Sequence, residues 1–315
     1  MSKPICLRAI ASKNMLLALS CLAFVASLCS CQKDLVYAVD ADRRIEVSFS
    51  WNDVEKKDFM DVWFFPSVGS GLFYSVPTDK VSTVDVQKGC LRTFCYNNDN
   101  DINQFEISTW EESVVTTGNT ELLTKAVFGD NEQGIPRGGD VDEPVRFQPS
   151  ELYCDTCSTI ADGQSHIMFA PKSPLMEIDV IVKSVKGFEG VKYASAALSG
   201  MAGSLNLSTL KPTGVACTIP MEMTVNADAT ISGKSLSFGR LENFAGKNVL
   251  TIYVLLSDGQ KIYYTYDVSE RMEQSAENAK IELIIEEMKI PEVQANGGFN
   301  PQLDAWNTIE EEIAM

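Results

Sequence analysis

Short runs in which every second residue is hydrophobic recur along most of this chain of 315 residues. In residues 44–51 the hydrophobic side chains are Ile45, Val47, Phe49 and Trp51. Because they alternate with polar side chains, the run is typical of a β-strand with one face in water. Similar runs follow at short spacing, separated by Gly, Pro, Asn and Asp, in residues 62–65, 71–77, 80–86, 89–98 and 103–109. Many short strands with regular turns predict an all-β sandwich.

A second set of strand-like runs begins after residues 129–149, a turn-rich and acidic stretch that is expected to form a long surface loop. These runs lie in residues 174–185, 215–225, 229–238, 248–268 and 279–291. In the first of them, four alternating side chains are expected to share one face: Met176, Ile178, Val180 and Val182. Ser-Asp-Gly-Gln at 257–260 predicts a hairpin turn. Residues 267–279 predict a short helix with Asp267 as its cap and Glu270 completing a capping box.

The length of the chain favours two domains, because domains typically hold about 50 to 200 residues. We place the boundary near Pro171 and Pro174, where one set of runs gives way to the next. The predicted domains are an N-terminal β-sandwich at residues 44–172 and a C-terminal β-sandwich at residues 173–315.

The N-terminus has the pattern of a secretory signal peptide. Residues 15–28 are fourteen residues without a charge, preceded by Lys3, Arg8 and Lys13 and by no acidic residue. A transmembrane helix needs about 20 apolar residues, so this run is short for a span. A positive segment followed by an apolar one of this length predicts a signal peptide at residues 1–30.

Residues 28–31, Leu-Cys-Ser-Cys, resemble a bacterial lipobox, in which a small residue precedes an invariant cysteine. In this interpretation Cys31 is the first mature residue and carries lipid, palmitate included, and residues 31–43 form a tether. Cys21 and Cys29 have less suitable residues before them. Several buried acyl chains, at about 0.8 kcal/mol per CH₂, hold a protein stably on a membrane, whereas a single chain is marginal. The alternative is an ordinary signal peptide with an incidental cysteine.

The predicted mature chain is strongly acidic. Without residues 1–30 it has 23 Lys and Arg against 43 Asp and Glu, a formal charge of −20. Nucleic-acid binding and electrostatic attraction to anionic lipid both depend on basic patches. The composition therefore argues against nucleic acid as a partner and leaves the N-terminal lipid as the contact with the membrane.

Besides Cys31, five cysteines remain after residue 30: Cys90, Cys95, Cys154, Cys157 and Cys217. In an exported chain some could form disulfides, but the odd number leaves at least one over, and the sequence does not settle the pairing. Cys154 and Cys157 form a CxxC motif, but a redox site would place it at a helix start and no helical pattern follows. A zinc site would need a second close pair, and His166 is the single histidine. Buried thiols are therefore expected, with no metal site.

Two further features could bind ligands. The Asn/Asp-rich residues 97–101 offer oxygens, but they lack the EF-hand spacing and are typical of a turn. Five aromatic residues could line a sugar-binding face or pack within the sheets: Phe73, Tyr74, Tyr263, Tyr264 and Tyr266.

Motifs for catalysis are missing from the sequence. It has no glycine-rich phosphate loop and no serine in a nucleophile elbow. Among 43 acidic residues nothing selects a pair for glycoside hydrolysis. We therefore expect a protein that is not an enzyme, with no catalytic residues and no cofactor.

Several short motifs follow one another in a characteristic order. They are the lipobox, Val-Ser-Phe-Ser-Trp at 47–51, Gly89-x-Leu91-x-x-Phe94-x-Tyr96-Asn97, Ala-Leu-Ser-Gly-Met-Ala-Gly-Ser-Leu at 197–205, and Gly298-Phe299-Asn300-Pro301 with Trp306 before an acidic end. In this order the chain resembles the fimbrillin-like lipoproteins of Bacteroides-type bacteria, close to their minor-fimbrium anchor proteins and to a related group of uncharacterised function. The resemblance covers nearly all of the predicted mature chain.

This resemblance implies two tandem transthyretin-like β-sandwiches on a lipid anchor in the cell outer membrane, facing the periplasm or the outside. It implies a fimbrial anchor or accessory subunit that acts in fimbria assembly and cell adhesion. Its partners would be fimbrial subunits joined by strand addition, in which main-chain hydrogen bonds give affinity and side-chain pockets give register. The alternative is a non-polymerising surface lipoprotein that binds glycan or a host protein.

Polymerising members of the family that the chain resembles lose an N-terminal strand when a protease cuts after an arginine. Arg43 and Arg44 stand at the start of the first predicted strand, so they mark a candidate site of proteolytic processing. A cut there would also sever the tether. Two solvent-facing arginines at a strand start are the simpler interpretation, because charges at strand edges commonly serve solubility.

Overall fold

In the computed structural model the described residues are 43–52, 54–67, 70–87, 89–129, 134–274, 279–292 and 306–308. The predicted signal peptide, Cys31 and the tether up to residue 42 lie outside these ranges, as does the motif at 298–301. Within them, no helix has the length and the apolar character needed to cross a membrane. Strands make up nearly all of the regular structure, as the alternating runs predict.

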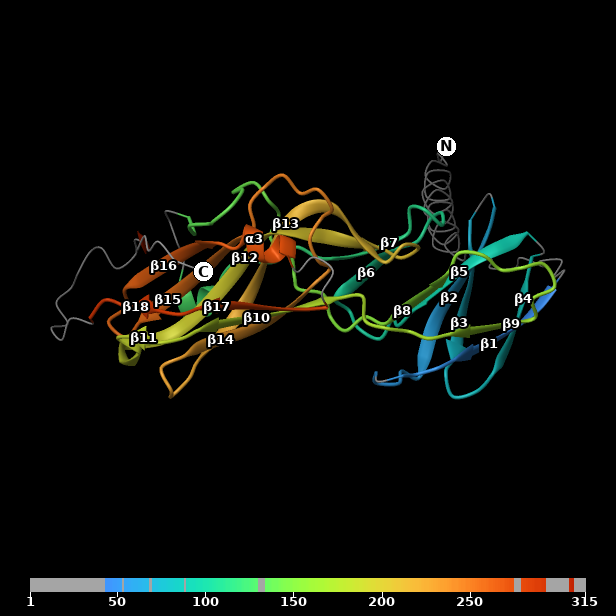
Figure 1. Ribbon diagram of the computed structural model, residues 1–315, viewed down its shortest axis with the longest axis horizontal. Coiled ribbons are helices and arrows are strands. Elements are labelled where there is room, and N and C mark those ends of the chain that lie inside the picture. Colours follow the sequence, from blue (N-terminus) through green and yellow to red (C-terminus); the bar gives the residue numbers. More distant parts are fainter. Residues whose placement is uncertain are drawn as a thin grey trace, which may run out of the picture. The chain divides into compact units, whose positions relative to one another are not determined.

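Seven strands from residues 43–169 form two sheets (Figure 1). The three-stranded sheet has the order β4-β1-β9 and the four-stranded sheet has the order β3-β2-β5-β8. Their bounds are β1 Arg43–Phe49, β2 Phe59–Pro66, β3 Leu72–Pro77, β4 Ser82–Val86, β5 Cys90–Tyr96, β8 Cys154–Cys157 and β9 His166–Phe169. β1 pairs with β4 on one side and with β9 on the other, so the first strand lies in the middle of its sheet.

A hydrophobic core fills the space between these two sheets. Ile45 and Val47 of β1 and Phe64 of β2 are fully buried in it, and Trp51 packs against it from just beyond β1. The buried positions of β1 alternate with exposed ones, as the pattern of residues 44–51 predicts. The two sheets and the shared core form a β-sandwich.

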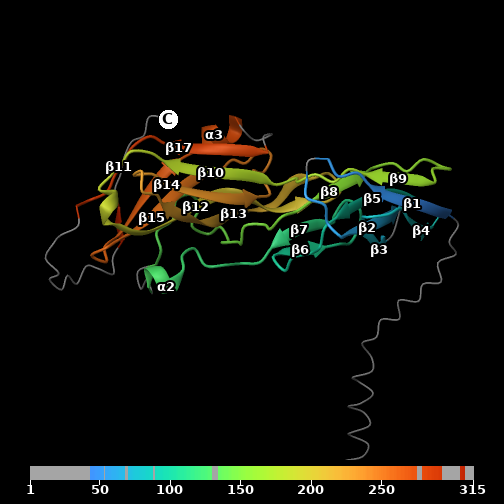
Figure 2. The same ribbon diagram turned by 90° about the horizontal axis from the view of Figure 1, so that it is seen from below.

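The second half of the chain contributes most of a ten-stranded sheet (Figure 2). Its main order is β17-β10-β14-β13-β12-β15-β16-β19, and β6 and β7 join it through β12. The bounds are β6 Asn103–Glu106, β7 Val114–Thr117, β10 Met176–Val182, β12 Val191–Asn206, β13 Lys211–Val225, β14 Ile231–Ser237, β15 Val249–Leu256, β16 Lys261–Asp267, β17 Lys280–Ile285 and β19 Trp306–Thr308. The remaining elements are β11 Val185–Lys186, paired with β18 Met288–Lys289, and α2 Lys125–Phe128, the 3₁₀ turn η1 Phe188–Gly190 and α3 Ser269–Gln274.

This long sheet folds over on itself and encloses a second core. Buried side chains from seven of its strands, β10 and β12 to β17, belong to one hydrophobic cluster. The four residues expected to share a face of the first run are all in it: Met176, Ile178, Val180 and Val182. The predicted hairpin at 257–260 connects β15 to β16, and α3 lies within the predicted helix at 267–279. The fold is therefore all-β and built of sandwiches, as predicted.

The β6–β7 hairpin crosses the boundary that the sequence suggests. β7 comes from the predicted N-terminal domain, yet it pairs antiparallel with β12, with Thr116 opposite Ser204. A third hydrophobic cluster also combines both halves, for example Phe94 and Trp110 with Leu205. The backbone pairing and this cluster connect the two sets of strands. The domain boundary near residue 172 stays a prediction.

Residues 134–149 are part of the predicted surface loop, but they also pack against the sheet. Its backbone packs on the outer face of β15: the Gly138 amide donates to the Thr251 hydroxyl at 3.0 Å, and the Tyr253 hydroxyl donates to the Pro136 carbonyl at 2.8 Å. Glu143 within it is only 8 % exposed. The reason lies in β15, whose eight residues are all buried, so that both of its faces need a cover.

Candidate strand-accepting groove

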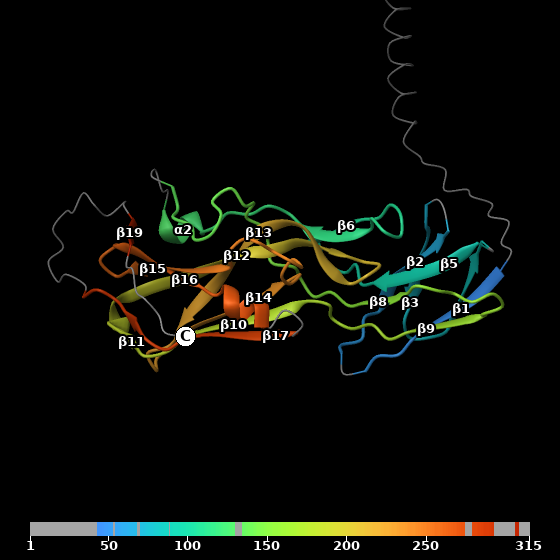
Figure 3. The same ribbon diagram turned by 45° about the horizontal axis from the view of Figure 1, so that its top comes forward.

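The second sheet has an open seam between β16 and β17. β17 pairs with β10, whereas β16 pairs with β15 and, over its first three residues, with β19 (Figure 3). Among the described residues, no backbone pairing joins β16 to β17. A groove of about 560 Å³ lies along this seam, lined by residues of β16, α3 and β17. Figure 2 shows α3 beside β17.

The floor of the groove belongs to the hydrophobic core. Leu250 of β15, Tyr266 of β16, and Leu283 and Ile285 of β17 line the groove and are buried in the core cluster. Ile284 also lines the groove and is 36 % exposed. An extended segment with apolar side chains could therefore extend the core from this side.

Within the described ranges, the backbone of β17 has no pairing partner on the side away from β10. The Glu177 amide donates to the Ala279 carbonyl at 2.7 Å, and the Lys183 amide donates to the Ile285 carbonyl at 2.8 Å. In a parallel ladder, residues that bond to one neighbour alternate with residues whose N–H and C=O groups point the other way. Because the odd-numbered carbonyls face β10, the N–H and C=O groups of Glu282 and Ile284 face away from it. This edge is a template for another strand.

The rim of the groove is acidic. Glu270, Glu282 and Glu286 line it, together with Arg271. The surplus of carboxylates favours a partner segment whose outward side chains are basic or neutral, because like charges opposite one another destabilise a strand pair.

A network of four charged side chains fixes the first residue of β17. The Lys280 ammonium lies 2.6 Å from an oxygen of Asp179 and 3.0 Å from one of Glu177, and Lys234 of β14 approaches the same two carboxylates. Burial alone would raise the pKa of Asp179, but the hydrogen bonds and charges of the two lysines outweigh it and lower that pKa. The hydrogen bond from Lys280 lowers the pKa of Glu177.

Helix α3 closes one end of the groove. Its Met272 is fully buried in the core. At its start, one oxygen of Asp267 accepts hydrogen bonds from the Ser269 amide at 3.1 Å and from the Ser269 hydroxyl at 2.6 Å. Hydrogen bonds from Lys247 and Ser269 lower the pKa of Asp267 to about 2. The helix begins at Ser269 and Val268 accepts its first backbone hydrogen bond, so Asp267 lies one residue before the predicted cap position and bonds to the first helical residue. The predicted capping box is wrong, because the carboxylate of Glu270 accepts a hydrogen bond from the Gln274 amide further along the helix.

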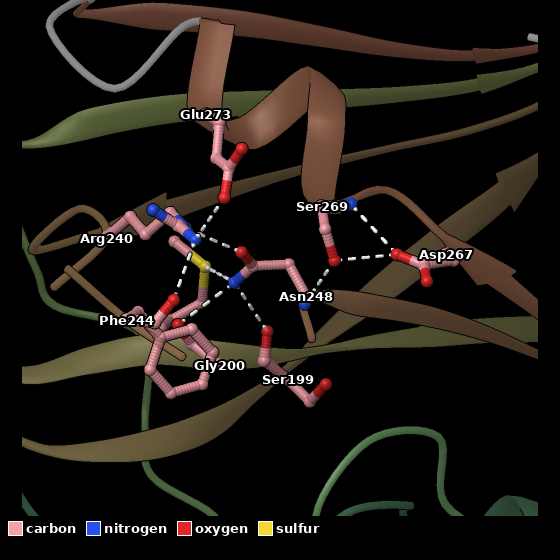
Figure 4. Close-up of polar contacts among 9 residues, drawn as sticks. Ser199, Gly200, Arg240, Phe244, Asn248, Asp267, Ser269 and Glu273 are labelled. Carbon is pink, nitrogen blue, oxygen red and sulfur yellow. Dashed lines mark hydrogen bonds and ion pairs between the residues drawn. The ribbon is translucent and has the colours of Figure 1, made fainter. Parts of the chain in front are cut away.

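A buried amide connects α3 to the rest of the sheet (Figure 4). The side-chain nitrogen of Asn248 donates to the carbonyls of Ser199 at 3.2 Å and Gly200 at 3.0 Å in β12. Its oxygen accepts from Arg240 Nε at 2.9 Å, and its backbone N–H donates to the Ser269 hydroxyl at 2.9 Å. Gly200 has φ of 75° and sits where the register of β12 shifts. The amide thus satisfies the carbonyls of this irregular turn and holds the start of α3.

Arg43 and Arg44 lie at the start of β1, where the sequence placed them. The Arg43 guanidinium donates to the carbonyls of Ala161 and Gln164, and the exposed Arg44 pairs with Asp85 at 3.1 Å. The residues that follow are held in the middle of a sheet. A cut after Arg44 would therefore separate the tether and leave the buried part of β1 in place.

The five cysteines of the described chain are free thiols, four of them buried and Cys157 half-buried. Cys154 and Cys157 are the first and last residues of the strand β8, not the start of a helix. Burial raises the pKa of the Cys95 and Cys154 thiols and raises that of Cys217 to about 12. A redox cysteine needs a lowered pKa, so this geometry favours the expected structural thiols over the redox alternative.

Residues 97–101 form the predicted turn, between β5 and β6. The Asn97 amide donates to Asp99 at 2.6 Å and to the Glu151 carbonyl at 3.1 Å, and Lys57 pairs with Asp99 at 3.1 Å. The carboxylate of Asp99 is therefore already neutralised by an ammonium group. No cluster of three or more His, Cys, Asp or Glu suited to a metal ion occurs in the described part of the chain.

The five candidate aromatic residues do not share one face. Tyr264 and Tyr266 are buried in the second core, so they cannot line a sugar-binding surface. Tyr263, which precedes Tyr264 in β16, packs on Trp306 from the other side of the sheet. Phe73 is 48 % exposed on β3, and Tyr74 packs against the first core. The single histidine, His166, lies in β9 with Nε2 2.8 Å from the Ser48 hydroxyl.

The two sandwich cores and the seam define an all-β protein with a sheet edge above an apolar groove, an edge that no other described strand pairs. A family model described as a domain of unknown function, DUF5119, matches residues 29–222. This match covers more than half of the sequence, and the chain belongs to this family. No curated protein matches the sequence.

Several solved structures share the fold at low sequence identity. A candidate adhesin from Bacteroides ovatus ATCC 8483 has a TM-score of 0.60 and 14% identity, covering 80% of this chain and 94% of its own. Another candidate adhesin from Bacteroides ovatus has a TM-score of 0.50 and 9% identity, covering 77% and 88%. The fimbrial anchor protein Mfa2 from Porphyromonas gingivalis has a TM-score of 0.47 and 16% identity, covering 77% and 90%.

Similarity at this level of identity concerns the fold. The first of these structures confirms the all-β sandwich and the predicted likeness to Bacteroides-type proteins. The family match, to a domain of unknown function, agrees with the predicted resemblance to a group of uncharacterised function.

Proposed function

We propose that this chain is a lipid-anchored outer-membrane protein that acts as an anchor or accessory subunit in fimbria assembly and cell adhesion. Three observations support the proposal: the fold shared with the first Bacteroides ovatus candidate adhesin, the lipobox-like residues 28–31, and the seam of the second sheet. The assembly role rests on one of them, the unpaired edge of β17 above an apolar groove.

Cys31 carries the lipid in this proposal. The short apolar run before it and the small residue Ser30 suit cleavage just ahead of this cysteine. Lipid on its thiol and its amino group would hold the mature chain at the outer membrane, on the periplasmic or the outer face. A Cys31→Ala variant is then expected to leave the membrane fraction.

The partner is a segment of a fimbrial subunit that adds to the edge of β17. Main-chain hydrogen bonds to Glu282 and Ile284 would give affinity, and apolar side chains entering the groove would fix the register. The acidic rim selects a segment with basic or neutral outward side chains. The mode of assembly does not depend on a cut at Arg43-Arg44, because the groove lies in the other sheet. An intact junction suits an anchor, and a cut junction suits a stalk or tip subunit.

An Ile284→Pro substitution tests the assembly role. Proline has no N–H and is tolerated on edge strands where that group faces solvent, so β17 is expected to keep its pairing with β10. The missing donor and the added ring would obstruct an incoming strand. In cells that carry this variant in place of the wild type, we expect the amount of the chain that co-purifies with fimbriae to fall about tenfold or more, the effect of about 1.4 kcal/mol.

Ile284→Ala is the matched control, because it shortens the same side chain and keeps the backbone donor. Wild-type levels of association for Ile284→Pro, with an unchanged thermal unfolding curve, would refute strand addition at this edge. A non-polymerising lipoprotein that binds glycan or a host protein would give that result. Mass spectrometry of the mature N-terminus tests the anchor separately: a lipidated Cys31 supports it, and a chain that starts at Ile45 supports a polymerising subunit.

A further inference from the structure

The outer face of β2 and β3 carries two exposed aromatic positions with polar side chains between them. The cross-strand pairs are Phe59 with Pro77, Asp61 with Ser75, and Trp63 with Phe73. Because side chains alternate along a strand, these three pairs lie on one face. It is the face opposite to the core residues Met60, Val62 and Phe64. β3 is the end strand of its sheet, so the face reaches the edge (Figure 1).

The aromatic rings on this face are accessible. Phe59 is 59 % exposed and Phe73 is 48 % exposed. Trp63 lies beside Phe73 with ring centroids 5.1 Å apart, and its indole N–H donates to the Tyr96 hydroxyl at 3.1 Å. The hydrogen bond and the packing hold the tryptophan ring in place. Neighbouring exposed rings on a rigid sheet are typical of a binding surface, because exposed hydrophobic area is otherwise unfavourable.

A polar hollow of about 550 Å³ lies beside Phe59 on this face. Asp61, Ser75, Asn98 and Asp99 contribute carboxylate, hydroxyl and amide groups to its wall. The Asn98 amide donates to Asp61 at 3.2 Å. Burial raises the pKa of Asp61, although hydrogen bonds from Asn98 and Ser75 act in the other direction. The carboxylate is therefore partly removed from water and held in one orientation.

We propose that this face of β2 and β3 binds a neutral oligosaccharide, with sugar rings on Phe59 and Phe73 and hydroxyl groups on Asp61, Ser75 and Asn98. A sugar ring has an apolar C–H face that packs on aromatic rings and an edge of hydroxyl groups that bond to carboxylates and amides. Phe59 and Trp63 are four residues apart on one strand, or about 13 Å at 3.3 Å per residue. That length accommodates a short chain of sugar rings.

The charges of the hollow select against acidic sugars. Glu55, Asp58, Asp61 and Asp99 line it with two lysines, Lys56 and Lys57. Lys57 is already paired with Asp99 at 3.1 Å and with Glu151 at 3.1 Å. Because the remaining charge is negative, an anionic glycan would be repelled, whereas a neutral one has hydroxyl groups that donate to the carboxylates.

The test is titration of the purified mature protein with four neutral probes: maltoheptaose, cellohexaose, mannohexaose and hexa-N-acetylchitohexaose. Binding is measured by calorimetry and by saturation-transfer NMR. We expect at least one probe to bind, Phe59→Ala and Phe73→Ala each to weaken it about tenfold, and Asp61→Asn to weaken it as well. Phe147→Ala removes another ring of 48 % exposure, away from this face, and is expected to leave binding unchanged.

The proposal is overturned if none of the four probes binds, or if the double variant of Phe59 and Phe73 binds like the wild type. Thermal unfolding of each variant shows whether it is folded. If Phe73→Ala does not fold, Phe59→Ala and Asp61→Asn carry the test. Ile284→Pro should bind the probe like the wild type, so failure of the sugar site and failure of the β17 edge give different results.

Discussion

The ammonium group of Lys280 lies 2.6 Å from a carboxylate oxygen of Asp179, so the first residue of the edge strand β17 is fixed to β10. Lys234 holds the same carboxylate from β14 at 3.3 Å. The edge that is proposed to receive a partner is thus anchored on its other side by charges from two neighbouring strands. A strand that must offer its backbone to a partner without separating from its own sheet benefits from such an anchor.

In the Lys280→Met variant, the free energy of unfolding is expected to depend less on pH in the acidic range. The lysines lower the pKa values of Asp179 and Glu177 in the folded state, below their ordinary 3.8 and 4.5. A lowered carboxylate pKa stabilises the fold above the ordinary value, and that contribution is lost as the pH falls through the lowered one. The difference in free energy of unfolding between wild type and variant should therefore be largest at neutral pH and should shrink below about pH 4.

Urea unfolding at several pH values measures this difference. Lys125→Met is the control, because Lys125 pairs with Glu121 at 3.5 Å with both side chains about two-thirds exposed (66% and 63%). Exposed pairs contribute little, so this variant should follow the wild type at each pH. Equal behaviour of the two variants would contradict an anchoring role for Lys280.

Asp267→Ala is expected to loosen the start of α3 at one end of the groove. The variant loses the acceptor for the Ser269 amide, which is worth about 1 kcal/mol at a helix start. Hydrogen exchange of the α3 amides should accelerate, whereas Asp267→Asn should retain most of the protection because asparagine forms the same turn. In the wild type this protection should persist above about pH 4 and decline as the pH approaches 2, since the pKa of Asp267 is lowered to about 2.

Glu270→Gln serves as the control for this experiment. Glu270 lies in the same helix, and its carboxylate accepts from the side chain of Gln274 at 3.0 Å. Protection of the α3 amides should be unchanged in it. If Asp267→Ala also retains full protection, Asp267 does not hold the helix start.

Asn248→Ala is expected to destabilise the protein by about 3 kcal/mol, because a buried group that loses its partner costs about 1 to 3 kcal/mol. The substitution leaves the carbonyls of Ser199 and Gly200 without this donor, and Arg240 Nε without this acceptor. Chemical unfolding measures the loss. Asn226→Ala is the matched control: its half-buried amide bonds to the hydroxyls of Thr230 and Ser232, and it should cost less than about 1 kcal/mol. An equal loss of unfolding free energy in the two variants would contradict the proposed role of the Asn248 amide in stabilising the fold.

Cys157 is expected to be the most reactive thiol of the described chain. It is half-buried, whereas Cys90, Cys95, Cys154 and Cys217 are buried and have raised pKa values. Labelling of the native mature protein with a thiol reagent near neutral pH should show one fast site that Cys157→Ser removes. The buried thiols should react at rates limited by unfolding. Fast labelling of Cys154 would revive the redox interpretation of the CxxC motif.

The residues of the groove illustrate what sequence patterns can and cannot predict. Alternation in residues 279–291 predicts a strand whose inward side chains include Leu283 and Ile285, and both are buried in β17. The same pattern does not reveal that β17 pairs with β10, about a hundred residues earlier in the chain, or that it is the end strand among those the structure describes. Alternation does not predict β9 either, because its four residues are too few for a periodic signal and its partner is the distant β1.

Three tyrosines in β16 also show the difference between what the sequence pattern predicts and what the tertiary structure decides. The sequence offers Tyr263, Tyr264 and Tyr266 as candidates for an aromatic surface, because period-two patterns do not reveal which face is buried. In the structure Tyr264 and Tyr266 face the core, and Tyr263 packs on Trp306. Likewise, the loop at 134–149 has the composition of a surface segment, and only the double-sided burial of β15 explains why it is packed against the sheet.

The sequence by itself determined the all-β class, most strand positions, the hairpin at 257–260 and the short helix after β16, because alternation, turn residues and helix caps act over a few neighbouring residues. Only the tertiary structure decided the strand order, the open seam between β16 and β17, and the aromatic face of β2 and β3. These features depend on pairings between segments far apart in the chain, which carry no local signal.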